Sequence, residues 1–167
     1  MEFLRSTPSR QDFLTPVLPR IGEPPARADI DMAQEMQTEN AALHPSTRGG
    51  RIHGHAAMVV SPERYAAKYS NIAYIWEVNP GEGPVFPANV TAASAQTLEN
   101  DYTSSTCVFQ DQTRMQTALK KQLYIQYPTE YWTGLIEPGI GIATVSLLEM
   151  YTHLYTNFGQ ITDRDLE

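Results

Sequence analysis

The sequence predicts an all-α protein: a small bundle of about four to five helices with a disordered N-terminal tail and a short extended segment before the first helix. Three observations support this class. Between Leu147 and Phe158, apolar residues recur at steps of three and four, the period of one helix face. Residues 91–127 contain neither Gly nor Pro. Alternating runs typical of strands are scarce.

The composition of the chain changes near residue 51. Residues 1–51 hold six of the twelve Pro, whereas all nine Tyr and both Trp lie beyond them. A segment with so few large apolar groups cannot bury enough surface to offset its ordering entropy. We therefore predict that residues 1–45 form a disordered tail, with one helical alternative at Ile30–Leu43, and that residues 46–167 form the folded domain.

The first elements of this domain follow from local signals. Ile52–Val60 is compatible with a short extended segment. Ser61 and Pro62 are typical of an N-cap followed by proline at the first helical position, which predicts a helix through about Tyr69. Residues 78–90 contain three Pro and two Gly in thirteen positions, so we expect a loop there.

Helical patterning resumes at Thr91 and continues to Pro128. The residues that share one apolar face are Leu98, Tyr102, Phe109, Leu119 and Leu123. The polar run Ser104–Thr106 weakens this face midway. One long helix, or two helices with a break near this run, both fit.

The C-terminal third predicts two further helices. Thr129 can cap a short helix that carries Tyr131, Trp132 and Leu135, and residues 137–139 (Glu-Pro-Gly) should end it. After residues 143–144, the stretch LLEMYTHLYTNFGQITDRDLE has an apolar helical face.

The end of that stretch carries stop and start signals. Gly159 can adopt the left-handed conformation that ends a helix. Thr162 can then cap a new helix whose first turn holds Asp163, Asp165 and Glu167, where the helix dipole favours acids.

The charge distribution argues against direct nucleic-acid binding. The net charge is −7, and residues 52–167 carry six basic and twelve acidic side chains. This is the wrong sign for attracting phosphates, and Lys120–Lys121 is the one adjacent basic pair.

No run is apolar enough for a signal peptide or a membrane span. Cys107 is the single cysteine, so no internal disulfide can form, which fits a reducing compartment. We therefore expect a cytoplasmic protein, and without a membrane span we expect no membrane partner.

The residues most able to carry chemistry lack the partners that chemistry requires. His53 and His55 are two residues apart, so on an extended strand both side chains would point to the same side, as two metal ligands do. No third ligand follows at a spacing typical of zinc sites. Cys107 has no base nearby in sequence to activate it. Glu149 and His153 lie four apart without the second His of HExxH. We therefore expect no catalytic residue, cofactor, metal site or small-molecule substrate.

Three segments together resemble a known family. They are HGHAAMVVSPERYA (53–66), NPGEGPVFPANVTAA (79–93) leading to Phe109 and ALKKQLYIQY (118–127), and LLEMYTHLYTNFGQITDRDLE (147–167). In this order and spacing they resemble the Gag-like (capsid) proteins of copia-type LTR retrotransposons. The similarity covers roughly residues 47–167.

The resemblance implies a helical domain that self-associates into particles enclosing RNA. In family chains the final Asp-Leu helix continues, often toward a zinc knuckle, so this chain looks like a truncated copy. A knuckle needs three Cys and one His, whereas this chain has one Cys. We therefore expect a homo-oligomer that reaches RNA only indirectly.

Self-association requires apolar surface left over after the core is filled. Trp132, Tyr151 and Tyr155 are the candidates for this interaction surface, although the same periodicity also fits buried residues.

Two other functions remain open. An acidic helical adaptor module would bind a peptide or basic protein partner in a groove lined by Leu148, Tyr151 and Phe109 with an acidic rim. An enzyme would need a pocket in which His53, His55, Cys107 and carboxylates converge.

Overall fold

The computed structural model describes residues 25–46, 53–69 and 74–159. Its elements are α1 (Arg27–Leu43), η2 (Ala56–Met58), α2 (Pro62–Lys68), α3 (Ala92–Gln126), η3 (Thr129–Trp132), η4 (Ile142–Thr144) and α4 (Leu147–Phe158), where η denotes a 3-10 helix. No strand occurs in these ranges, which contain one isolated antiparallel bridge between Glu137 and Gly141. The all-α prediction is therefore confirmed.

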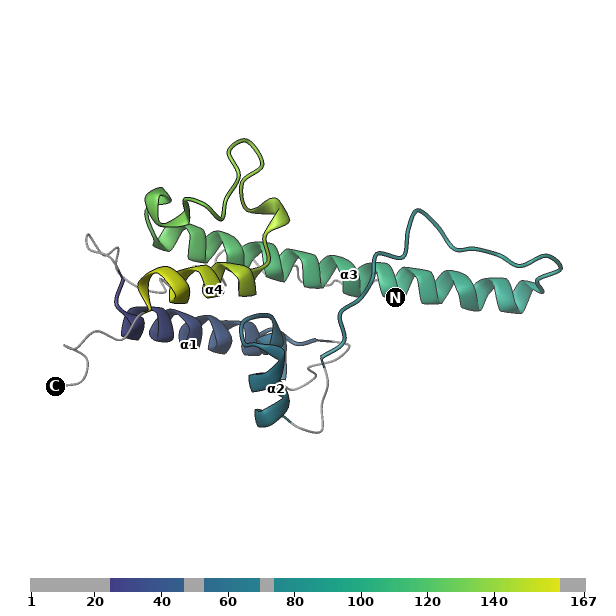
Figure 1. Cartoon of the computed structure of the whole chain (residues 1–167). Helices are drawn as coiled ribbons and strands as arrows, with labels where there is room; N and C mark the ends of the chain where they lie inside the picture. The colour runs from purple at the N-terminus through teal and green to yellow at the C-terminus, as the bar shows by residue number, and fades with distance from the viewer. Residues whose placement is uncertain (1–24, 47–52, 70–73, 160–167) are drawn as a thin grey trace.

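A three-helix layer forms the body of the molecule (Figure 1). Helices α1, α4 and the C-terminal half of α3 lie side by side and contact one another. Apolar side chains from these elements and their connections fill the space between them: Ile30, Met58, Met115, Leu119, Leu123, Trp132, Leu147, Met150, Tyr151 and Leu154. The N-terminal half of α3 projects beyond this body, and α2 lies across the end of α1.

Helix α1 corrects the predicted tail. Residues 27–43 are helical, so the prediction of disorder through residue 45 is wrong in this range, and the helical alternative at Ile30–Leu43 is right; residues 1–24 lie outside the described part of the chain. The helix buries Gln34 and Gln37 besides its apolar residues. Because two of its inward positions are polar, its apolar pattern is weak in sequence, and packing against α3 and α4 stabilises it.

Residues 53–60 are not extended, contrary to the prediction. The chain turns at Gly54, where φ is +55°, and then forms η2. The amide of His55 donates to the Ala41 carbonyl over 2.9 Å. A Cβ at Gly54 would lie 2.4 Å from the His44 carbonyl oxygen. The tight turn therefore results from close packing against the C-terminal carbonyls of α1. These carbonyls lie about ten residues earlier in the chain, so the local sequence around Gly54 does not indicate the turn.

Helices α2 and α3 begin as predicted. Ser61 Oγ accepts a hydrogen bond from the Arg64 amide, and Pro62 occupies the first turn of α2. Thr91 Oγ1 accepts from the Ser94 amide at the start of α3. Helix α3 continues unbroken for 35 residues, about 52 Å. Since neither Gly nor Pro interrupts it, the single-helix alternative holds.

The buried face of α3 differs from the predicted one in its N-terminal half. Leu119 and Leu123 are buried, together with Val108, Gln112, Met115 and Lys120. Leu98, Tyr102 and Phe109 are partly exposed instead. The reason is that this half of the helix extends past α1 and α4 and has no helix packed against it.

Helix α4 has the predicted bounds and a capping box. Ser146 Oγ accepts from the Glu149 amide, and the Glu149 carboxylate accepts from the Ser146 amide over 2.7 Å. Gly159 caps its end with φ −89°, so the left-handed prediction is wrong. Pro128, not Thr129, is the N-cap of η3. The predicted helix from Thr162 lies outside the described residues.

Candidate interaction surface

Trp132 is not a surface residue. Its side chain is 1% exposed, and its ring lies 6.2 Å from that of Tyr124 and 6.1 Å from those of Tyr127 and His153. The bulky ring fills the space between the end of α3 and α4. The prediction that it forms an interaction surface is therefore wrong.

Tyr151 is also buried, and it belongs to a polar network inside the core. Its hydroxyl donates to Gln37 Oε1 over 2.5 Å. Gln37 Nε2 donates to the Leu119 carbonyl over 2.9 Å and to Gln122 Oε1 over 3.1 Å. Burial raises the pKa of Tyr151 well above its ordinary value. Gln37 thus connects α1, α3 and α4, and Tyr151 is 2% exposed, so Tyr151 belongs to the core and the prediction that it forms an interaction surface is wrong.

Tyr155 is the one predicted surface residue that is partly exposed. Its hydroxyl donates to Asp31 Oδ1 over 2.6 Å and approaches Gln34 Oε1 at 3.1 Å. The Arg27 guanidinium lies 5.5 Å from the centre of its ring. Burial, and then the hydrogen bond to Asp31, raise the pKa of Tyr155. These contacts fix α4 to the start of α1 and leave the Tyr155 side chain partly exposed.

A shallow groove of about 390 Å³ runs between α1, α2 and α4. Leu148, Tyr151 and Tyr155 line it, together with Arg64. It differs from the groove expected for an adaptor, because Phe109 lies on α3 away from it and its charged lining residue is basic.

The histidines and the cysteine considered for chemistry do not converge. His55 is buried, and its Nδ1 lies 2.7 Å from the Tyr74 hydroxyl. The His53 ring packs on Tyr69 with ring centres 4.0 Å apart. Cys107 lies partly buried on α3. In the described ranges, no three His, Cys, Asp or Glu side chains are placed to hold a metal ion.

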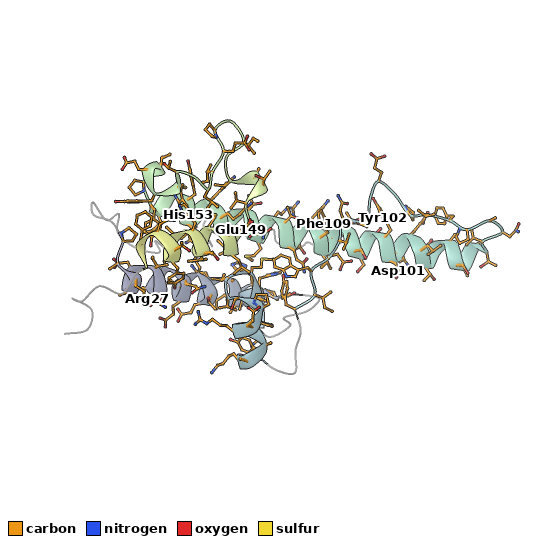
Figure 2. All side chains as sticks on the ribbon, in the orientation of Figure 1. Arg27, Asp101, Tyr102, Phe109, Glu149 and His153 are labelled. Atoms are coloured by element: carbon orange, nitrogen blue, oxygen red, sulfur yellow. The ribbon has the colours of Figure 1, made fainter. Side chains whose placement is uncertain are left out.

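Glu149 and His153 lie one turn apart on α4 (Figure 2), beside a second shallow depression. Both have structural partners. Hydrogen bonds from Ser146 lower the pKa of Glu149. His153 Nε2 donates to the Tyr131 carbonyl over 2.8 Å, and its Nδ1 lies 3.3 Å from Asn157 Nδ2. This arrangement holds η3 against α4.

The projecting part of the molecule is a different kind of surface, which we call the arm. It comprises residues 74–111: the extended segment 74–91 and the N-terminal part of α3 beside it (Figure 1). Gln112 anchors its base, because its Nε2 donates to the Ile75 carbonyl and its Oε1 accepts from the Glu77 amide, both over 2.8 Å. Farther out, the Tyr102 hydroxyl donates to the Gly81 carbonyl over 2.8 Å (Figure 2).

The arm exposes large apolar side chains along its extended segment. Ile75 is 54% exposed, Val78 81% and Val85 85%, and Trp76 and Phe86 are nearly half exposed. Within the described ranges these account for five of the nine exposed large apolar residues. Several large apolar side chains exposed along one segment are a feature of interaction sites. The arm is therefore the candidate interaction surface.

The arm is also uniformly acidic. Residues 74–111 contain no Lys, Arg or His, and their acids are Glu77, Glu82, Glu99, Asp101 and Asp111, a net charge of −5. Sequence reasoning treated residues 78–90 as a loop and missed this surface. One signal in the sequence could have revealed it. Val78, Val85 and Phe86 lie among Pro and Gly residues, which form no helix or strand that could bury these apolar side chains.

Comparisons with known proteins give no further assignment. No family model, curated protein or solved structure matches the chain. None of the described helices is both long and apolar enough to cross a membrane.

Proposed function

We propose that this chain is a structural, self-associating capsid-like domain of the Gag type, in keeping with its resemblance to copia-type retrotransposon proteins. Copies of the chain would pack into a particle in the cytoplasm. RNA would contact the chain only indirectly, because a single cysteine cannot form a zinc knuckle.

The exposed apolar residues of the arm are the observation that carries this proposal. A packed body and a projecting segment with Val78 and Val85 almost fully exposed are suited to contacts between subunits. The anchoring of residues 75 and 77 by Gln112 holds that segment in place before any contact forms, so little ordering entropy would be lost on association.

Sedimentation velocity on the purified chain, from micromolar to near-millimolar concentration, tests the proposal. We expect the mass-average sedimentation coefficient to rise with concentration for the wild type and to rise much less for Trp76→Ser/Val78→Ser. Leu43→Ser, which removes an exposed apolar side chain from the end of α1, is the matched control and should behave as wild type. A wild-type chain that stays monomeric throughout would contradict self-association.

The charge of the arm supports a second candidate, an acidic adaptor module that binds a peptide or basic protein partner. The acids of the arm flank its apolar side chains. This arrangement is complementary to a partner segment that carries both Lys and aliphatic residues. Fluorescence anisotropy with a synthetic alternating Lys-Val peptide tests it. The adaptor function predicts 1:1 binding by a monomeric chain, weakened by Glu82→Lys and unchanged by Glu130→Lys in the body; absence of binding would exclude this partner class.

A further inference from the structure

The charges of α3 are segregated along its length. Within its described residues, the acids Glu99, Asp101 and Asp111 all precede Gln112, and the bases Arg114, Lys120 and Lys121 all follow it. No acid occurs between Gln112 and Thr129. One end of the helix is therefore acidic and the other basic.

Two of these bases form an exposed stripe with an apolar residue. Arg114, Lys121 and Ile125 are exposed, and Ile125 is 72% exposed. At 100° per residue these positions lie within about 40° of one another, about half a turn away from the buried Leu123. We call this set the outer stripe of α3. It combines positive charge with an apolar group, whereas the arm combines negative charge with apolar groups.

The outer part of the arm cannot reach the far end of the outer stripe within one molecule. Glu99 and Lys121 belong to the same unbroken helix and are separated by about 33 Å along its axis, although Asp111 and Arg114 are only three residues apart. Pairing the arms of two copies would bring five carboxylates of one against five of the other, which is repulsive. Pairing an arm with an outer stripe brings opposite charges together and covers apolar residues on both.

We propose that the arm of one copy docks on the outer stripe of α3 in a second copy. This inference rests on the proposed self-association and specifies the surfaces that carry it. The two surfaces differ, so the contact is heterologous. The acids that face the second copy include Glu82 and Glu99, and the bases that receive them are Arg114 and Lys121.

Charge reversal on each surface provides the test. One variant, Glu82→Lys/Glu99→Lys, reverses the two arm acids that face the stripe and changes the net charge of the arm from −5 to −1; the other, Arg114→Glu/Lys121→Glu, replaces the two exposed bases of the stripe with acids. Each variant alone should associate about tenfold more weakly than wild type or worse. An equimolar mixture should regain association, because the two lysines placed on the arm of one variant then meet the two glutamates placed on the stripe of the other.

The matched control is Glu35→Lys/Glu39→Lys, which makes the same charge change at exposed positions of α1 and should associate as wild type. All samples are measured by sedimentation velocity, with circular dichroism to verify folding. This docking mode is overturned if both the arm variant and the stripe variant associate as strongly as wild type, or if the mixture of the two does not regain association. In either case the proposed self-association still stands. A monomeric wild-type chain overturns both.

Discussion

The hydroxyl of Tyr151 on α4 donates a hydrogen bond of 2.5 Å to Oε1 of Gln37 on α1, 114 residues earlier in the chain. The other end of the Gln37 amide donates to the Leu119 carbonyl of α3. One buried side chain thus fixes the relative positions of all three helices of the body. A polar group satisfied in this way specifies one packing arrangement, because any other leaves it without partners.

Tyr151→Phe should destabilise the fold, because it leaves Gln37 Oε1 buried without its donor. We expect the free energy of unfolding in urea to fall by about 1–3 kcal/mol. Tyr155→Phe is the comparison: its acceptor Asp31 is exposed, so water can replace the lost bond and the loss should stay below about 1 kcal/mol. Equal losses for the two variants would show that the buried network has no special role.

Gly54→Ala should be among the most damaging single substitutions in the chain. At φ +55° the new Cβ would approach three backbone carbonyl oxygens at the end of α1, at 2.4, 2.6 and 2.7 Å. We expect a loss of more than about 2 kcal/mol in the free energy of unfolding. Gly83→Ala has nothing within 4 Å of its Cβ and should change stability by less than about 0.5 kcal/mol. An undamaged Gly54→Ala variant would refute the turn geometry.

His55 should make the fold sensitive to mild acid. Burial, and then the neighbouring His44, lower its pKa below the ordinary 6.5; a hydrogen bond with the Pro45 backbone, and then Asp111, oppose this only in part. Above pH 6.5 the ring is neutral in both folded and unfolded chains, so it adds no pH dependence. Below that pH the unfolded chain binds a proton that the folded chain does not, and stability falls until the folded pKa is reached.

The measurement is the free energy of unfolding of wild type and of His55→Gln as pH falls from neutrality. The wild type should lose more stability below pH 6.5 than the variant, because Gln can accept from the Tyr74 hydroxyl but does not titrate. Parallel curves would mean that His55 protonates equally in both states.

Gln112→Ala should loosen the base of the arm without unfolding the body. The substitution removes both hydrogen bonds to the extended segment, so the Glu77 amide should exchange with deuterium faster while amides of α1 and α4 keep their protection. Gln96→Ala removes an exposed amide farther out on α3 and serves as control. An unchanged Glu77 amide would show that other contacts hold the arm.

Local signals in the sequence were enough to place three helices. Helix α2 was placed by its N-cap Ser61 followed by Pro62, helix α3 by a long run without Gly or Pro, and helix α4 by its apolar period. The caps Thr91 and Ser146 act through hydrogen bonds within three residues, so they too are local signals. Helix α1 was assigned to the tail, because its inward face includes Gln34 and Gln37 and so lacks an apolar pattern. Their partners lie on other elements and are invisible to local reasoning.

The interaction surface could not be derived in the same way. Trp132 and Tyr151 have the periodicity of an apolar face, but periodicity alone does not tell a core residue from a surface one. The exposure of Val78 and Val85 depends on α3 extending past α1 and α4, a matter of relative helix length and placement. Sequence shows the loop and the long helix separately, whereas the arm exists only once they are placed together.

The most direct test of the central claim is hydrogen exchange of the wild-type chain at low and at high concentration. Association through the arm predicts that amides in residues 74–86 and 114–125 gain protection as concentration rises, while amides of α1 do not change. Exchange rates independent of concentration, or protection confined to the groove between α1, α2 and α4, would contradict it.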